Sequence, residues 1–257
     1  MRIAILGAGK MGSWLAFALK GGNEIALYDT DSAKAGAVEG ARALASLDEL
    51  SGFAPQMLLN AASLQNTVAA FESALPNIPR DCVIADVASV KGGLREYYAK
   101  AGFRFVSVHP MFGPTFADMS ALREENAVII KGSDAEGAAV FRNLFNALGI
   151  RVFDYTFDEH DRMMAYSLTT PFAASLVFAA CMESAAVPGT TFARHRNIAR
   201  GLLSEDDHLL AEILFNQHSL AQLEKITSKL EFLKHVIKGK DYDEARRFFE
   251  KLRKNVA

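Results

Sequence analysis

The pattern of apolar residues changes along the chain. Up to about residue 155, short continuous apolar runs alternate with stretches in which apolar residues recur every three or four positions. Continuous runs are typical of strands buried on both faces of a parallel sheet, and the longer spacing is typical of helices. We predict strands at Arg2–Leu6, Glu24–Tyr28, Met57–Asn60, Cys82–Val87, Phe103–Val108, Ala127–Lys131 and Arg151–Tyr155, and helices at Met11–Lys20, Leu64–Leu75, Val90–Lys100 and Ala135–Leu148.

After residue 155 only the helical pattern remains. Fifteen of the 18 glycines precede this point, so helix breakers are scarce beyond it. One long helix is predicted from Leu220, Leu223, Ile226, Leu230, Leu233 and Ile237, with Gly239 as its stop. The predicted fold class is therefore α/β. An N-terminal Rossmann domain with a doubly wound parallel sheet (1–155) is followed by an all-α C-terminal domain (156–257).

Composition narrows the choice of environment and partner. The 257 residues carry 28 basic and 30 acidic side chains, a net charge of −2, and half of the residues are hydrophobic. Such a chain is typical of soluble globular proteins, and its charge makes nucleic acid an unsuitable partner. Two cysteines cannot build a disulfide framework, and the N-terminus lacks the pattern of a signal peptide. We expect a cytoplasmic protein.

A stretch of twenty residues without charge, Met163–Met182, is long enough to span a bilayer. Several polar residues and one proline interrupt it and predict a kink, namely Tyr166, Ser167, Thr169, Thr170, Pro171 and Ser175. We predict no membrane span. We expect instead a helix buried nearly all round, inside the helical domain and across a subunit interface.

A glycine-rich turn follows the first predicted strand and opens the first predicted helix. Gly7, Gly9 and Gly12 form a G-x-G-x-x-G pattern, with Lys10 and Met11 between the second and third glycines. In this context the first glycine permits a tight turn, the second admits a pyrophosphate, and the third lets helix and strand pack closely. These five residues are the predicted cofactor-binding loop.

An acidic residue ends the second predicted strand. Asp29 lies 22 residues after Gly7, where a carboxylate accepts hydrogen bonds from the ribose hydroxyls and repels a 2′-phosphate. No basic residue follows until Lys34. The cofactor predicted is therefore NAD rather than NADP, although the strictness of that preference stays open.

Two polar segments follow later strands, Asp86–Gly92 and Val108–Thr115. His109 in the second segment is the only histidine of the first domain. Because histidine titrates near neutrality, it can take a hydroxyl proton while hydride leaves the same carbon. Position alone leaves two interpretations of His109 open, a catalytic base and an ordinary loop residue.

The other histidines are predicted to have structural or surface roles. Their spacing forms no local metal motif, so we predict no metal site; they are His160, His195, His208, His218 and His235.

Two motifs together resemble the prephenate/arogenate dehydrogenase family of tyrosine biosynthesis: the run Val108–Pro114 (VHPMFGP) and the run Asp86–Lys91 (DVASVK). The resemblance extends along the chain through Glu159–Asp161, Thr190–His195 and Ile198–Asp207. It implies an NAD(P)-dependent oxidative decarboxylation of the small molecule prephenate to 4-hydroxyphenylpyruvate. It also implies a homodimer formed through the helical domains.

The resemblance assigns roles residue by residue. His109 falls on the family's catalytic histidine, and Ser89 on the serine that holds the substrate hydroxyl and the nicotinamide in line. Arg194 matches an arginine that binds a substrate carboxylate, a role that suits a guanidinium. Lys91 is expected to be a supporting cation near the substrate.

The sequence departs from the family at the strand end 58–63, which lacks a proline often found there, and in the segment 167–172. Thr169 and Phe172 stand where several members carry histidines, so Thr169 is a predicted substrate-binding residue and the choice between prephenate and arogenate stays open. Another small-acid dehydrogenase of the same layout and a catalytically silent NAD-binding regulator are the alternatives. A regulator would need neither His109 nor Arg194. Tyrosine feedback and a separate chorismate mutase partner also stay open, and we expect no chorismate mutase module within the chain.

Overall fold

The computed structural model describes residues 1–113, 122–183 and 187–256. The chain divides into two compact units, Met1–Arg162 and Met163–Ala257. The first is a Rossmann-type α/β unit and the second is helical, which confirms the predicted fold class. The domain boundary predicted from the sequence lies at the end of the last strand, at Tyr155. The boundary between the two compact units lies after Arg162, inside the helix that follows this strand.

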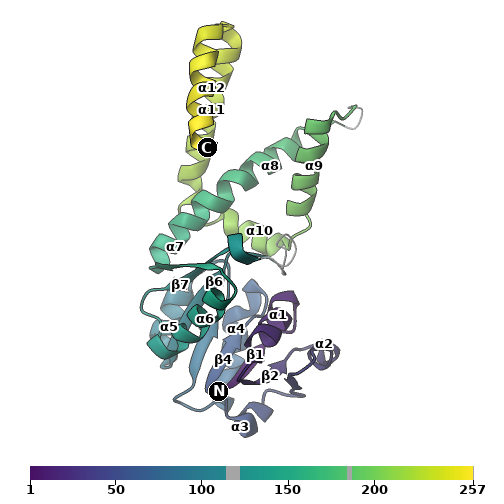
Figure 1. Ribbon diagram of the computed structural model, residues 1–257, viewed down its shortest axis with the longest axis vertical. Coiled ribbons are helices and arrows are strands. Elements are labelled where there is room, and N and C mark those ends of the chain that lie inside the picture. Colours follow the sequence, from purple (N-terminus) through teal and green to yellow (C-terminus); the bar gives the residue numbers. More distant parts are fainter. Residues whose placement is uncertain (114–121, 184–186, 257) are drawn as a thin grey trace. The chain divides into compact units, whose positions relative to one another are not determined.

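The first unit is built on an eight-stranded sheet in the order β3-β2-β1-β4-β5-β6-β7-β8 (Figure 1). The strands are β1 (Arg2–Leu6), β2 (Glu24–Tyr28), β3 (Arg42–Ala43), β4 (Met57–Asn60), β5 (Val83–Asp86), β6 (Arg104–Pro110), β7 (Asn126–Ile130) and β8 (Arg151–Tyr155). The prediction missed β3, whose two exposed residues form no apolar run.

The sheet departs from the predicted parallel arrangement at one pair of strands. β6 and β7 are antiparallel, with His109 opposite Val128, whereas every other pair is parallel. A parallel return needs a crossover, usually a helix. Between β6 and β7 the described residues hold only the 3₁₀ helix η3 (Leu122–Glu124), and the chain re-enters the sheet from the same edge.

Helices cover both faces of this sheet. The helices of the first unit are α1 (Lys10–Leu19), α2 (Ser32–Gly36), α3 (Glu49–Phe53), η1 (Leu64–Asn66), α4 (Thr67–Ala74), η2 (Leu75–Asn77), α5 (Leu94–Ala101) and α6 (Ala135–Ala147). Alternate residues of a strand point to opposite faces, so Ile3 and Ile5 of β1 join one core cluster and Ala4 and Leu6 join the other.

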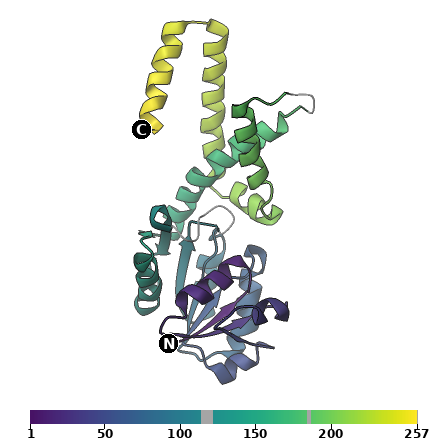
Figure 2. The same ribbon diagram turned by 45° about the vertical axis from the view of Figure 1, so that its right-hand side comes forward.

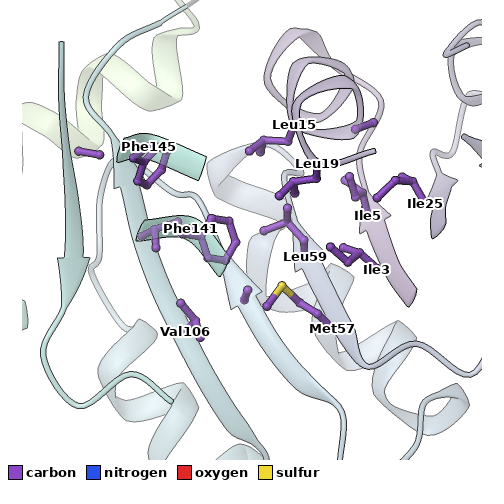
Figure 3. Packing of buried hydrophobic residues seen from close by; sticks show 14 of the residues in the cluster. Ile3, Ile5, Leu15, Leu19, Ile25, Met57, Leu59, Val106, Phe141 and Phe145 are labelled. Atoms are coloured by element: carbon purple, nitrogen blue, oxygen red, sulfur yellow. The ribbon is translucent and has the colours of Figure 1, made fainter. Parts of the chain in front are cut away.

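The first core cluster lies between the sheet and the helices α1 and α6. Figure 3 shows Leu15 and Leu19 of α1 and Phe141 and Phe145 of α6 turned toward strand residues that include Met57. The second cluster packs α3, α4 and α5 against the other face. With both faces covered, the carboxyl edge of the sheet is where a ligand can approach the strands.

The second unit consists of helices. The helices after β8 are α7 (Phe157–Met164), the π-helix η4 (Ala165–Thr169), α8 (Thr170–Ala180), α9 (Thr190–Leu202), α10 (Asp207–Leu214), α11 (Ser219–Gly239) and α12 (Tyr242–Val256). α11 and α12 run antiparallel beside each other (Figures 1 and 2), with Phe232 packed on Phe248. Gly239 is still helical, and the left-handed residue that ends α11 is Lys240, one position later than predicted.

The uncharged stretch, as far as Ala180, lies in a continuous helical run, Phe157–Ala180, that by length and composition is able to cross a membrane. Its most apolar window has a mean hydropathy of 1.4, and only 22% of that window is buried. Within the single chain this helix is therefore not buried nearly all round. Covering by a second subunit stays a prediction.

Candidate active site

The carboxyl ends of the central strands meet at one edge of the sheet. The pairing places Leu6 beside Tyr28 and Asn60, and Asp86 beside both Asn60 and Ser107. The glycine turn, Asp29 and the segment after β5 therefore begin at one level. β6 continues past this level and carries His109 beyond the ends of its neighbours.

The glycine turn has the geometry that its sequence predicts. Gly7 has a φ of +97°, and a Cβ there would lie 2.7 Å from the carbonyl oxygen of Ala61. A Cβ on Gly12 would collide with the carbonyl oxygen of Gly7. A Cβ on Gly9, by contrast, would meet nothing within 4 Å. The backbone is thus closely packed at Gly7 and Gly12, whereas the space beside Gly9 is open.

Gly9 is also the N-cap of α1, and no side chain caps this helix. Lys10 is exposed and Met11 is half-buried in the first turn. An uncapped helix N-terminus with open space above a glycine is a suitable cradle for a pyrophosphate. The residues present therefore fit a dinucleotide.

Asp29 is fixed by backbone amides at the end of β2. Its carboxylate accepts hydrogen bonds from the N–H of Ala8 at 2.6 Å and from the N–H of Asp31 at 2.8 Å. Lys34, the first basic residue after it, lies 3.8 Å from Asp31. A half-buried carboxylate that contacts the glycine turn is positioned to accept hydrogen bonds from ribose hydroxyls.

His109 belongs to a row of three interacting side chains, two of them buried histidines. Its Nδ1 lies 3.0 Å from Nε2 of His160, and Nδ1 of His160 lies 3.2 Å from a carboxylate oxygen of Asp161. His109 is 6% exposed and His160 is fully buried. The prediction of a structural or surface role for His160 did not foresee this contact with His109.

Burial sets the protonation of both rings. It lowers the pKa of His109 well below the usual value, and the neighbouring His160 and Lys91 lower it further. Burial also lowers the pKa of His160, although the hydrogen bond to Asp161 opposes this effect. Both imidazoles are therefore neutral at neutral pH, and a neutral His109 is able to accept a proton.

Lys91 lies inside the protein. Its ammonium group forms a buried ion pair with Asp86 and donates a 2.7 Å hydrogen bond to the carbonyl of Val108. The hydroxyl of Tyr98 donates to the other carboxylate oxygen of Asp86 at 2.6 Å. Burial lowers the pKa of Lys91, although Asp86 favours its charged form. In this arrangement Lys91 holds the strand residue before His109, and its contact with substrate stays a prediction.

A capping box fixes the start of α7 and hence the position of His160. The hydroxyl of Thr156 accepts from the N–H of Glu159 at 3.1 Å, and Glu159 accepts from the N–H of Thr156 at 2.7 Å. Lys131, directly after β7, donates to the same carboxylate at 3.0 Å. The T-x-x-E spacing is visible in the sequence and predicts this helix start. Nothing local predicts that the next residue, His160, meets His109.

The remaining predicted residues are dispersed. Ser89 is half-buried in the loop after β5. Arg194 is exposed on α9 of the second unit, so its part in this site stays a prediction. Thr169 is buried in that unit, where its hydroxyl lies 2.6 Å from that of Ser219. Pro114 and Thr115 lie outside the described residues, within which no group of three metal-ligating side chains occurs.

The fold and this edge define a Rossmann-type protein with a helical second unit. Solved structures share the fold over nearly the whole chain. The A. aeolicus prephenate dehydrogenase in complex with hydroxyphenyl propionate and NAD⁺ has a TM-score of 0.84 and 17% identity over 99% of this chain and 96% of that one. The Synechocystis arogenate dehydrogenase has a TM-score of 0.79 and 20% identity over 99% and 98%.

Sequence comparison adds a relative that matches part of the chain. The T-protein of Enterobacter agglomerans is 33% identical over 93 residues, which are 36% of this chain but only 24% of that protein. No family model matches the chain. The resemblance to prephenate and arogenate dehydrogenases predicted from the sequence is therefore confirmed, and it is a likeness of fold along almost the entire chain.

Proposed function

We propose that this chain is an NAD-dependent dehydrogenase of tyrosine biosynthesis that oxidises and decarboxylates prephenate to 4-hydroxyphenylpyruvate. The observation that carries the proposal is a buried His109 at the same sheet edge as the glycine turn. Prephenate and arogenate dehydrogenases with the same fold support the choice of substrate class.

The cofactor is held by the glycine turn and by Asp29. The uncapped N-terminus of α1 at Gly9 binds the pyrophosphate, and the carboxylate of Asp29 binds the ribose hydroxyls. NAD supplies a hydride acceptor when it is bound. The negative charge of Asp29 disfavours a 2′-phosphate, which supports NAD over NADP.

His109 is the base in this proposal. Its Nε2 accepts the proton of the substrate hydroxyl while the hydrogen of the same carbon leaves as hydride. Loss of the ring carboxylate as carbon dioxide then makes the ring aromatic, and His109 returns the proton to the phenolate oxygen. The reaction needs alignment and a base more than it needs further activation.

Substrate alignment is assigned to Ser89 and Arg194. The hydroxyl of Ser89 holds the substrate hydroxyl in line with His109, and the guanidinium of Arg194 binds a carboxylate. Arg194 is exposed and carries a fixed charge, as carboxylate recognition requires.

The test is an assay of NADH absorbance with purified protein, prephenate or arogenate, and NAD or NADP. We expect turnover with prephenate and NAD, and a loss of about 10²–10⁴-fold in kcat for His109→Asn. His208→Asn, on an exposed residue of α10, is the matched control and should keep full activity. Turnover with arogenate alone would contradict the choice of prephenate. Tight NAD binding without turnover of either acid would favour a regulator.

The proposal includes a cytoplasmic homodimer formed through the helical units. The long apolar run Phe157–Ala180, mostly unburied in the single chain, would then be covered by a second subunit rather than by lipid. Fractionation of expressing cells tests this: the protein should stay in the supernatant after membranes are pelleted, and recovery only with detergent would contradict it.

A further inference from the structure

His160 and Asp161 lie where they govern the protonation geometry of His109. All three residues belong to the first unit: β6 carries His109, and the first turns of α7 carry the other two. The contact joins residues 51 positions apart, with a 3.0 Å separation of ring nitrogens and an angle of 65° between the rings. His160 is fully buried, so water does not compete for its Nε2.

The direction of the hydrogen bonds follows from the chemistry of the last member. An ionised carboxylate only accepts hydrogen bonds, so Nδ1 of His160 carries the proton that is shared with Asp161. In a neutral imidazole the other nitrogen is then a bare acceptor. Nδ1 of His109 must therefore carry a proton and donate it to Nε2 of His160, which leaves Nε2 of His109 with its lone pair free.

We propose that His160 and Asp161 are positioning residues, which hold His109 in the tautomer whose Nε2 is free to act as the base. The inference rests on the proposed function for the identity of the reaction, but not for the tautomer itself. When His109 takes up a proton at Nε2, its Nδ1–H still donates to His160. The new positive charge thus remains hydrogen-bonded, and Asp161 lies behind it.

The groups around the two histidines favour this direction of the hydrogen bonds, from Nδ1 of His109 to Nε2 of His160. His109 is faced by His160 from α7 and by Lys91 from the loop after β5, and its β7 neighbour Val128 is apolar. His160 is faced by Asp161, Lys91 and Asp86. Burial lowers the pKa of His160, so the ring stays neutral. A doubly protonated His160 would donate to His109 and reverse its tautomer.

The first test reads the tautomer directly. Protein labelled with ¹⁵N-histidine is studied without substrate by long-range ¹⁵N–¹H correlation, and His109→Asn assigns the His109 signals. We expect His109 to be protonated on Nδ1 in the wild type. Asp161→Asn, whose amide is able to donate to His160, should shift His109 toward the Nε2–H form. A wild-type His109 protonated on Nε2 would overturn the proposal, whether or not the protein turns over either acid.

The second test uses a matched pair of variants. The side chain of Gln places an acceptor where Nε2 of His160 stands, whereas Leu places none. His160→Leu should lower kcat by about 10²-fold with little change in KM, and His160→Gln should recover at least tenfold of that loss. Equal losses in both variants, or a rise in KM alone, would overturn the proposal. If neither acid is a substrate, the proposed function fails and the tautomer measurement alone decides this inference.

Should His160→Leu fail to fold, Asp161→Asn takes its place in the kinetic test. The side chain of Asp161 is 18% exposed and changes little in shape on this substitution, so folding should be retained. We expect a fall in kcat that parallels the fraction of His109 in the Nε2–H form. A fall in kcat without a change of tautomer would contradict the positioning role.

Discussion

His109 combines a reactive position with a suppressed positive charge. Its burial and the nearby ammonium group of Lys91 both disfavour the imidazolium form. Lys91 also donates a hydrogen bond to the carbonyl of Val108, which fixes the strand that carries the ring. A residue that served only to pack would not need both a buried cation and a second histidine beside it. The arrangement is typical of a base that must stay neutral until it accepts a proton.

This electrostatic arrangement predicts the pH dependence of the reaction. A base works while it is deprotonated, and the pKa of His109 is lowered below the ordinary value of about 6.5. The value of kcat/KM should therefore stay constant as the pH falls through about 6.5, and should decline only at lower pH. Initial rates from about pH 8 down to the limit of stability check this. An acid limb centred at or above about 6.5 would contradict it.

Asp29 makes a separate prediction about the cofactor. Asp29→Asn keeps an acceptor for the N–H of Ala8 and removes the charge that repels a 2′-phosphate. We expect the ratio of kcat/KM for NADP to that for NAD to rise by about tenfold or more. Assays with both cofactors at fixed substrate measure this ratio, and Asp31→Asn, two residues further on, is the control. An unchanged ratio would remove Asp29 from cofactor selection.

At the scale of elements, the turn between β1 and α1 separates a structural glycine from a binding glycine. Gly12 has the carbonyl of Gly7 against it, whereas Gly9 faces open space. Gly12→Ala should therefore destabilise the protein by about 1–3 kcal/mol, because overpacking against backbone cannot relax cheaply. Gly9→Ala should leave stability unchanged and weaken NAD binding. Thermal unfolding and NAD titration of both variants check the pair, and equal effects on stability would contradict this division.

The elements themselves were largely predictable, because buried strands and amphipathic helices leave local patterns. β1, β2, β4 and β8 have the bounds that the apolar runs predict. The antiparallel direction of β7 was not predictable, because an apolar run does not encode the direction of a strand. The π-helix η4 was likewise invisible, although Pro171, in the first turn of α8, marks its neighbourhood.

The candidate site was predictable where a motif is contiguous and not where contacts are distant in sequence. The glycine turn, Asp29 and His109 follow from motifs and spacing. His160 required the packing of α7 against the end of β6, across 51 positions of sequence. The buried position of Lys91 was equally hidden: its ammonium group contacts Asp86 and the Val108 carbonyl, and its contact with substrate stays a prediction. Charge alone does not say whether a side chain points outward.

On the scale of the whole molecule, the second unit has more apolar surface than a single chain buries. On α11 a stripe of apolar residues with seven-residue spacing is exposed: Leu223 by 43%, Leu230 by 52% and Ile237 by 65%. Heptad spacing is typical of helices that pair along a seam. The same helix packs η4 at its beginning and contacts α12 through Phe232 and Phe248, so it is anchored in the unit while its stripe remains uncovered.

The proposed homodimer would cover this stripe, and that gives the last prediction. The wild-type protein should have a mass near twice 28.0 kDa in light scattering coupled to size exclusion at micromolar concentration. In the double variant Leu230→Asp, Ile237→Asp, dimerisation would bury two charges per chain in the seam, which is unfavourable. This variant should therefore have the mass of one chain. Lys225→Glu, an exposed polar position on the same helix, should leave the dimer intact. A wild type of single-chain mass would contradict the homodimer. A double variant that still dimerises would place the subunit contact elsewhere. Because the Rossmann unit has its own core, the double variant should still bind NAD, which separates a lost interface from a lost fold.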